Sequence, residues 1–544
     1  MDQKLKSKQT ERNNKKANRF YQQKQKELMN LTSKLTSIIN ECNVNGNITV
    51  WECHLQLQSI INEIIEIEST LAKSKPNSRK LNLEKYVTWL RENKAEFEVF
   101  ESGLGLKATK DFTEGSLMLT VPRKLMMSVS KAEQSELSLF LEIDPLKVMP
   151  NYILAFYLLL EKQNPDSFWK PYIDVLPEKY TTILYFTSEE LAELRPSPVY
   201  VQSLKLYQSL VRWYAYFYKR INTMEHLPVM KKLKEVFTFE NYRWAISSVM
   251  TRQNNIPAAR EGREGRDDTA FIPLWDMCNH EDGTVILPIY VDINKNKIGQ
   301  VRVGLCQSFK LKISILVFIK SGLAAKAYKS NRHIYIVTHF LSNYNFQITT
   351  DYNKDLDRSE CYALRDFRAN EQVFIFYGPR PNCDMFLHNG FVYTNNKHDS
   401  LSLALGISSK DPLRFERLGL LKKLVLNYNL YRLPSPISAE LLAFIRIFTM
   451  KEEELKKIQS NDGFVWELVS PDAGNTAVDS ELDRRAYNYL LTRCTLIRRS
   501  YKIEDSDQLS EHRKNVKLLK QSEVQILDGA IDYLTQIIDK LPGK

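Results

Sequence analysis

The sequence has no apolar segment long enough to cross a bilayer. Its apolar runs, such as ISILVFI at 313–319, are far shorter than the about 20 residues that a membrane helix requires. Residues 1–16 are polar and charged, so we expect no secretory signal. The seven cysteines stand at scattered spacings without a paired motif, which favours a reducing compartment over a disulfide framework. We therefore expect a cytoplasmic protein, compatible also with the nucleus, and no membrane partner.

The sequence also lacks basic character over most of its length, although its formal net charge is +11. Residues 1–30 hold nine Lys/Arg and three Asp/Glu, a charge of +6, and residues 284–346 hold nine Lys/Arg and one Asp, a charge of +8. This leaves about −3 for the rest of the chain. A Lys-rich terminal arm is typical of a solvated or localising segment, so we do not expect nucleic acid as a partner.

The hydrophobic pattern divides the 544 residues into a basic helical N-terminal region, a β-rich region and a helical C-terminal region. In residues 1–75, apolar residues such as Leu57, Ile61 and Ile64 form one helix face, and SKPNSRK at 74–80 predicts a linker. Short strands joined by tight turns follow from about 97. A helical insertion is predicted over about 130–255, and strands return after 347.

Individual segments give the strongest signals. Strands are predicted at 97–100, 104–109, 117–122, 361–367 and 372–378, and helices at 151–163, 203–222, 237–255, 437–450 and 481–499, with a last helix ending near Leu541. The predicted fold class is α+β: a β-rich domain with a helical insertion, followed by an all-α C-terminal domain.

The run FIPLWDMCNH at 271–280 concentrates side chains that can carry chemistry. Zinc is disfavoured because one residue separates Cys278 from His280 and no second ligand pair accompanies them, so we expect no metal. A Cys–His nucleophile is disfavoured because close sequence neighbours rarely converge. Taken alone, the run fits a buried turn as well as a pocket, and Trp275 fits a core aromatic as well as a pocket wall.

The run belongs to a series of four motifs: GLGLKATKDFTEGSLMLTVP (103–122), RQN (252–254), WDMCNH (275–280) and FIFYG (374–378). In this order they resemble the SET-domain methyltransferases, and the helical C-terminal region resembles the substrate-binding domain of their Rubisco-methyltransferase branch. VMTRQN, IPLWDMCNH and ALRDFRANEQVFIFYG are similar to the actin-histidine N-methyltransferases within that branch. The resemblance implies a SET domain at 76–403 and a substrate-binding domain at 404–544. It also implies S-adenosyl-L-methionine as cofactor, actin as protein substrate, and a monomer.

Residue roles follow from the same resemblance. The implied cofactor-binding residues are Arg79, Ser102, Gly103, Leu104, Gly105, Arg252, Asp276, Asn279, His280, Tyr377 and Asn389. The implied substrate-binding residues are Trp275, Asn254 and Arg380, with Tyr377 and Asn254 as the catalytic pair. Three positions depart from the family, which has Glu at Ser102, Phe at Leu104 and Ser at Asn389. The first two flank the cofactor, so adenosine affinity is expected to differ.

Asn254 discriminates between substrates. A histidine is nucleophilic only when neutral, and only at the ring nitrogen without a proton. An amide oxygen that accepts the Nδ1–H would fix the tautomer and leave the Nε2 lone pair for the methyl group. The implied reaction is therefore methylation of Nε2 (tele) of a histidine in actin. Two alternatives stay open: a SET-fold lysine methyltransferase, and a non-catalytic actin-binding adaptor.

The segment 284–346 has no counterpart in this resemblance. In the family, the residues after the Asn–His pair run within a few positions into the segment matching QITTDYN. Here 63 residues intervene. An insertion of that length without an amphipathic period is uncommon between two strands of one compact domain.

We hypothesise that 284–346 is translated intron sequence, against the alternative of a basic docking loop. Sequencing of the transcript tests this, and we expect the abundant message to lack the codons for this segment. Abundant message that contains those codons would contradict the hypothesis.

Overall fold

The computed structural model describes most of the chain. The described residues are 2–45, 48–71, 79–101, 105–142, 145–224, 226–258, 267–283, 351–422, 428–459, 480–503 and 508–541, together with four short strands between 286 and 302. Those strands are β9 Ile286–Leu287, β10 Val291–Asp292, β11 Lys297–Ile298 and β12 Val301–Arg302, which pair as β9 with β12 and β10 with β11. The rest of the 284–346 segment lies outside the described residues.

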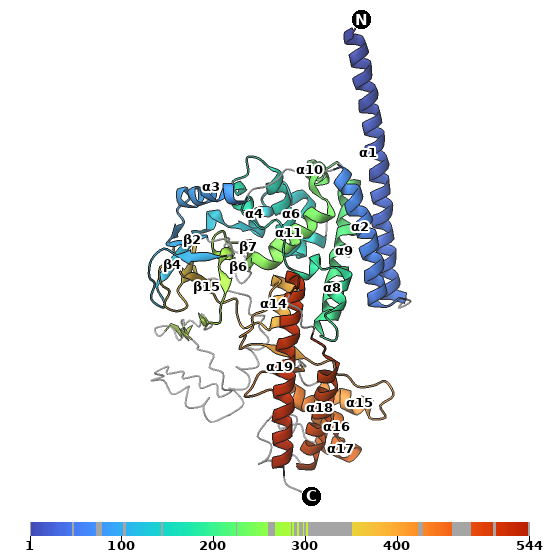
Figure 1. Cartoon of the computed structure of the whole chain (residues 1–544), viewed down its shortest axis with the longest axis vertical. Helices are drawn as coiled ribbons and strands as arrows, with labels where there is room; N and C mark the ends of the chain where they lie inside the picture. The colour runs from blue at the N-terminus through green and yellow to red at the C-terminus, as the bar shows by residue number, and fades with distance from the viewer. Residues whose placement is uncertain are drawn as a thin grey trace.

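The N-terminal region is a helical hairpin, as the sequence predicts. Helix α1 (Asp2–Asn40) leads through the π-helical turn η1 (Glu41–Asn45) into α2 (Val50–Leu71). Thr49 begins α2 with a capping box, because its hydroxyl accepts from the amide of Glu52 and its own amide donates to the Glu52 carboxylate. Leu57, Ile61 and Ile64 are fully buried, so the apolar face predicted for α2 packs against the body of the protein. Figure 1 shows α1 extending well beyond that body.

The β-rich region consists of small sheets built from strands far apart in sequence. One sheet has the order β1-β4-β14-β13, a second has β2-β3-β15-β8 and a third has β5-β7-β6. In the second sheet β8 and β15 pair in parallel, with Asn279 opposite Phe374 and His280 opposite Ile375. The strands are β1 Glu96–Phe97, β2 Val99–Glu101, β3 Leu106–Ala108, β4 Leu117–Pro122, β5 Met127–Ser128, β6 Gln253–Pro257, β7 Asp267–Phe271, β8 Asn279–His280, β13 Asp351–Asn353, β14 Arg358–Tyr362 and β15 Gln372–Ile375.

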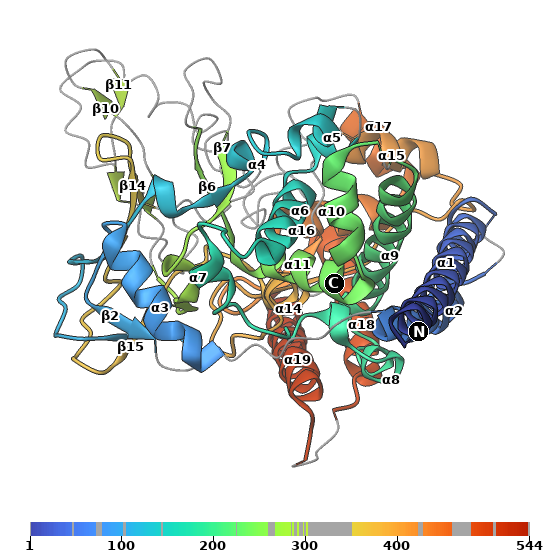
Figure 2. The same ribbon diagram turned by 90° about the horizontal axis from the view of Figure 1, so that it is seen from above.

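A helical layer separates these sheets from the N-terminal hairpin, as Figures 1 and 2 both show. Its central helices are apolar on the sides that meet, and α6 buries a continuous run from Ile153 to Leu160. The preceding α3 is Arg79–Glu92, and the helices of the layer are α4 Val129–Ala132, α5 Ser138–Glu142, η3 Pro145–Val148, α6 Pro150–Gln163, α7 Lys170–Ile173, η4 Ile183–Tyr185, α8 Ser188–Ala192, α9 Val199–Thr223, α10 Pro228–Val236 and α11 Phe239–Arg252.

The C-terminal region forms a second hydrophobic core, joined to the first by one helix. Val516 and Leu519 of α19 (Glu511–Lys540) are buried in the first core, whereas Leu527 and Leu534 of the same helix belong to the second. The remaining elements are η2 Arg123–Leu125, η5 Trp275–Met277, α14 Asn382–Asn389, β16 Ser400–Ser402, α15 Arg414–Leu421, β17 Asn429–Tyr431, α16 Ala439–Thr449, α17 Glu452–Gln459 and α18 Ser480–Ser500. The domain boundary at 403/404 stays a prediction.

Several predicted boundaries differ from the structure. The helix expected at 237–255 ends at Arg252, because Gln253–Pro257 pairs with β7 as strand β6. That helix is buried on most faces, Trp244, Ser247 and Ser248 included. The strand expected at 361–367 ends at Tyr362, and Arg79 and Lys80 of the predicted linker lie in α3. The C-terminal region also contributes one strand, β17, which pairs with β16.

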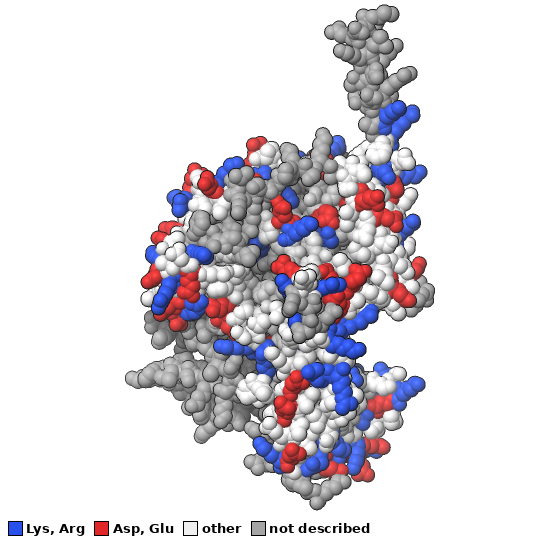
Figure 3. All heavy atoms as spheres, in the orientation of Figure 1, with Lys and Arg blue, Asp and Glu red and all other residues white. Residues whose placement is uncertain are grey.

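The described surface carries both charge signs. On the face in Figure 3, Lys/Arg and Asp/Glu alternate over the body without a large area of one sign. Among the described helices none is long and apolar enough to span a membrane. Within the same residues, no group of three or more His, Cys, Asp or Glu side chains is placed to hold a metal ion.

Gly390 gives a test of how α14 is docked. It ends α14 in the left-handed conformation with φ of 78°, and a Cβ there would lie 2.6 Å from the backbone carbon of Thr181. Because both the positive φ and the collision oppose a side chain, Gly390→Ala should lower the free energy of unfolding by about 2–4 kcal/mol in chemical denaturation.

Gly406→Ala is the matched control, since a Cβ at Gly406 would meet no atom within 4 Å. Its free energy of unfolding should stay within about 0.5 kcal/mol of the parent protein. Equal effects of the two substitutions would contradict this description of the α14 terminus.

Candidate functional site

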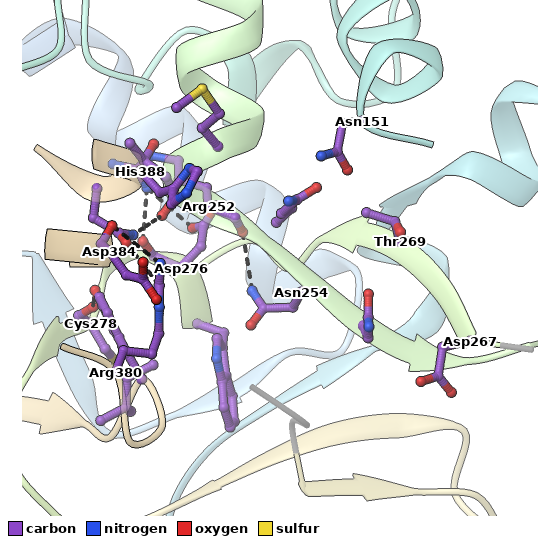
Figure 4. Close-up of a pocket in the computed structure, with 18 of the residues that line it drawn as sticks. Asn151, Arg252, Asn254, Asp267, Thr269, Asp276, Cys278, Arg380, Asp384 and His388 are labelled. Atoms are coloured by element: carbon purple, nitrogen blue, oxygen red, sulfur yellow. Dashed lines mark hydrogen bonds and ion pairs between the residues drawn. The ribbon is translucent and has the colours of Figure 1, made fainter. Parts of the chain in front are cut away.

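A pocket of about 750 Å³ opens where the end of α11, strand β6 and the segment after β15 meet. It gathers side chains from segments that are more than 100 residues apart (Figure 4). Seven of the residues singled out in the sequence line it: Arg252, Asn254, Trp275, Asp276, Tyr377, Arg380 and Asn389. The structure therefore brings together all the predicted substrate-binding residues and four of the predicted cofactor-binding ones.

A buried ion pair between Arg252 and Asp276 lines the pocket. Arg252 is the last residue of α11, and its Nη1 donates to the backbone oxygen of Asp276 at 2.9 Å and lies 3.4 Å from Asp276 Oδ1. The Asp276 carboxylate is fully buried and also accepts a hydrogen bond from the hydroxyl of Tyr172 on α7. Burial raises the pKa of Asp276, and the neighbouring Arg252 opposes that shift. Burial also disfavours the Arg252 charge, but Asp276 holds the pKa of this guanidinium above its ordinary value.

Asn254 lies on β6, opposite Ala270 of β7, with its side chain buried. Its Nδ2 donates to the backbone oxygen of Arg252 at 3.1 Å, which fixes the orientation of the amide. Figure 4 shows the amide oxygen of Asn254 turned away from this bond. The side chain thus offers a hydrogen-bond acceptor to a ligand in the pocket.

Trp275 lines the pocket and is held there by a tight turn. The preceding Leu274 has φ of 71°, a conformation that a branched side chain rarely adopts outside constrained sites. The turn is closed by the amide of Asp276, which donates to the oxygen of Ile272 at 3.1 Å. Trp275 is 6% exposed, and its Nε1–H has no hydrogen-bond partner among the described residues.

Tyr377 follows β15 and connects the pocket to the Asn279–His280 strand. Its hydroxyl donates to the backbone oxygen of Cys278 at 2.6 Å, and its amide donates to Nδ1 of His280 at 3.1 Å. Burial raises the pKa of Tyr377, so the phenol stays protonated and cannot serve as a base at neutral pH. Burial lowers the pKa of His280 to about 4, so that ring is neutral and carries its proton on Nε2.

His280 and Asn279 lie behind the pocket rather than in its lining. The His280 ring packs against Tyr377, Phe391 and Tyr393, with centroids 4.9–6.3 Å apart. A Cβ on Gly105, the residue before β3, would lie 2.5 Å from Nε2 of Gln372 and 2.9 Å from Nδ2 of Asn279. Gly105 therefore leaves room for these two side-chain ends.

Arg380 closes one side of the pocket. Its guanidinium donates to Oδ1 of Asn389 at 2.9 Å and reaches the backbone oxygen of Asp384 at 3.4 Å, both on α14. Asn389 also donates to the oxygen of Thr251 at 3.4 Å, so it ties α14 to the end of α11. Burial lowers the pKa of Arg380 and of His388.

Some predicted site residues cannot be placed. Ser102, Gly103 and Leu104 lie outside the described residues, and Arg79 is described only as the first residue of α3, without its side chain. The roles of these four residues remain predictions.

Sequence reasoning missed other residues of the site. Asp384 and His388 line the pocket from one face of α14, and their i, i+4 spacing on a polar helix face was the available signal. Tyr172 donates a hydrogen bond to the Asp276 carboxylate. Tyr180 lies close to Arg252, and its hydroxyl donates to Ser248 at 2.9 Å. Nothing in the local sequence marks these two tyrosines, because their partners are far along the chain.

The sequence matches two known protein families and a group of methyltransferases. Residues 103–378 match the SET domain family, and residues 408–542 match the family described as Rubisco LSMT substrate-binding. The actin-histidine N-methyltransferases of human and chicken are each 34% identical over 546 residues, covering 95% of this chain and 80% of theirs. The dog enzyme of that name is 34% identical over 527 residues, covering 93% of this chain and 78% of its own.

Solved structures share the fold. The SET domain of LSMT bound to lysine and AdoHcy superposes with a TM-score of 0.57 at 16% identity, over 85% of this chain and 93% of that one. Rubisco LSMT bound to AdoMet superposes with a TM-score of 0.56 at 16% identity, over 86% of this chain and 93% of that one. These likenesses confirm the predicted α+β class, and the matches to SET and actin-histidine N-methyltransferase sequences confirm the resemblance found in the motifs.

The Arg252–Asp276 pair gives a test of the pocket lining. Asp276→Ala would leave the Arg252 guanidinium buried without a counter-charge, so we expect a loss of about 3–5 kcal/mol in the free energy of unfolding. Chemical denaturation measures this. Asp166→Ala removes an exposed carboxylate as a control and should change the value by less than about 0.5 kcal/mol. A loss below about 1 kcal/mol for Asp276→Ala would refute the buried pair.

Proposed function

Because the chain belongs to the actin-histidine N-methyltransferase family of SET-domain proteins, we propose that it transfers a methyl group from S-adenosyl-L-methionine to Nε2 of a histidine in actin. The observation that carries the proposal is the fixed amide of Asn254, whose Nδ2 is committed to the Arg252 carbonyl. A lysine ammonium needs no acceptor that selects a tautomer, whereas a neutral imidazole does.

The residues present fit the cofactor. The Nε of Arg252 and the Nε1 of Trp275, two residues that line the pocket, are buried nitrogens without a hydrogen-bond partner among the described residues. Buried donors of this kind are normally satisfied, so they indicate a polar ligand with acceptor groups. The guanidinium of Arg252 suits a carboxylate such as the one at the methionyl end. Arg252, Asn279 and His280 would hold the cofactor, and Gly105 leaves room for the end of the Asn279 side chain.

The chemistry is a displacement at carbon. When bound, the cofactor supplies a methyl group on a sulfonium centre, whose thioether leaves with the bonding electrons. Asn254 holds the proton at Nδ1 of the substrate imidazole, so that the lone pair lies on Nε2 and forms the new N–C bond. The methylated imidazolium then loses its Nδ1 proton to solvent. Tyr377 stays a neutral phenol that donates its proton to the Cys278 carbonyl, so this bond does not use the lone pairs of its oxygen. Trp275 and Tyr377 wall the site, and this orders the attack geometry.

Mass spectrometry of an actin peptide after incubation with the protein and labelled cofactor tests the proposal. We expect one methyl group, located on Nε2 of a histidine. Methylation of a lysine instead would favour the lysine-methyltransferase alternative. Absence of any product, together with absence of cofactor binding in calorimetry, would favour the adaptor alternative.

Asn254→Phe should change the substrate preference. It removes the acceptor for Nδ1–H, so the kcat/KM for the histidine peptide should fall by about ten- to hundredfold, while methylation of a peptide with lysine in place of the histidine should rise. Asn62→Phe, at an exposed position of α2, is the control and should leave both rates unchanged. An unchanged preference in Asn254→Phe would remove the support for a tautomer-selecting amide.

We place this activity in the cytoplasm, with the nucleus as a second compartment. The six described cysteines are all free thiols, which supports a reducing location. Fractionation of cells followed by immunoblotting tests this location, and recovery in the secretory fraction would oppose it.

A further inference from the structure

A buried polar network lies between α14 and α19, behind the pocket. Its members are Asn382, Asn396, Asp399 and Ser522, which are 0–4% exposed. The carboxylate of Asp399 accepts from the amide nitrogen and from the Nδ2 of Asn382, each at 2.8 Å. It thereby satisfies the first turn of α14, whose N-cap residue, Pro381, has no side chain that can accept a bond.

Every polar position of Asn382 is used. Its Nδ2 donates to Asp399 and to the hydroxyl of Ser522 at 3.2 Å, and its Oδ1 accepts from the amide of Tyr393 at 3.0 Å and from Nδ2 of Asn396 at 3.3 Å. A buried amide with two donors and two acceptor sites filled has one stable orientation. The network is therefore a rigid connection.

The network ends at the backbone of Arg380. The Nδ2 of Asn396 donates to the Arg380 carbonyl oxygen at 2.8 Å. The guanidinium of the same residue is held by Asn389 on the pocket side. Arg380 is thus held at its carbonyl by the network and at its guanidinium by α14, so displacement of Asn396 removes one of its two anchors.

Ser522 brings the other domain into this network. It lies on α19, whose C-terminal half belongs to the second hydrophobic core. Its hydroxyl donates to the Asp399 carboxylate and accepts from Nη2 of Arg432 at 2.7 Å, a residue that follows β17 in the C-terminal region. Figure 1 shows α19 running from that region up to α14.

We infer that Ser522 and Asp399 are positioning residues for substrate: through Asn382 and Asn396 they set the place of Arg380 and thereby the affinity for the actin peptide. This rests on the proposed function, in which Arg380 contacts the peptide. The network meets the pocket at the Arg380 carbonyl, whereas Asn389 and Arg252 are reached only through the Arg380 side chain, so we expect peptide affinity to change more than cofactor affinity.

Ser522→Ala tests the inference. It removes the hydroxyl that donates to Asp399 and accepts from Asn382 and Arg432. We expect the positioning energy lost at Arg380 to equal about one buried hydrogen bond, which corresponds to a change of about three- to tenfold. We expect the peptide KM, and the peptide Kd from fluorescence anisotropy, to rise by this factor. The kcat and the cofactor Kd from calorimetry should stay within about twofold. If the alanine variant does not fold, Ser522→Cys, which keeps a weak donor of similar size, should show a smaller rise.

Two further variants separate positioning from general destabilisation. Asn396→Ala should raise the peptide KM in the same way, and the double variant with Ser522→Ala should show no more than the larger single effect. Glu523→Gln is the matched control: Glu523 is the next residue on α19, and its carboxylate accepts from Ser197 at 2.7 Å and from Tyr501 at 3.1 Å rather than from the side chains of the network. Its peptide KM should be unchanged.

Two results would overturn the inference. One is a peptide KM in the double variant that rises by the product of the two single-variant factors, and the other is a peptide KM in Glu523→Gln that rises as much as in Ser522→Ala. The inference would also be overturned by an unchanged peptide KM in Ser522→Ala while the unsubstituted protein methylates the peptide. If the unsubstituted protein neither binds nor methylates the peptide, the proposed function itself fails.

Discussion

The burial of Asp276 is the constraint on which the site depends. A fully buried carboxylate needs a counter-charge and donors, and here Arg252 and Tyr172 supply them. Because Arg252 ends α11 and Asp276 follows Trp275, their pairing holds the end of the helix against the tryptophan turn. The Arg252 carbonyl then receives Asn254 Nδ2, so one ion pair sets the orientation of the amide that faces the pocket.

The second requirement is that the segments around the pocket, which are distant in sequence, are held in fixed positions relative to one another. Tyr377 bonds to both residues 278 and 280, which locks the end of β15 to the strand that carries Asn279. Arg380 is held from the opposite side through a buried network that reaches α19. A methyl transfer needs the donor, the methyl carbon and the acceptor in line, and such alignment is obtained from rigid surroundings rather than from strong contacts.

Much of the fold follows from local patterns, whereas its junctions do not. The strand 117–122 and the helices 151–163 and 437–450 appear where apolar periodicity predicts them, because burial of one face decides these segments. The end of α11 was missed because β6 exists only by pairing with β7. Asn254, Trp275 and Tyr377 were found through motifs, but Tyr172 and Ser522 carry no local signal, since their roles arise from partners more than 100 residues away.

The central claim is that the Asn254 amide selects the tautomer of a bound histidine. A crystal structure with actin peptide and the spent cofactor, at a resolution that separates amide oxygen from nitrogen, measures this most directly. The account predicts Asn254 Oδ1 at about 2.7–3.2 Å from imidazole Nδ1, with Nδ2 still bonded to the Arg252 carbonyl. An Asn254 side chain turned away from the imidazole, or a histidine that presents Nδ1 to the cofactor, would contradict it.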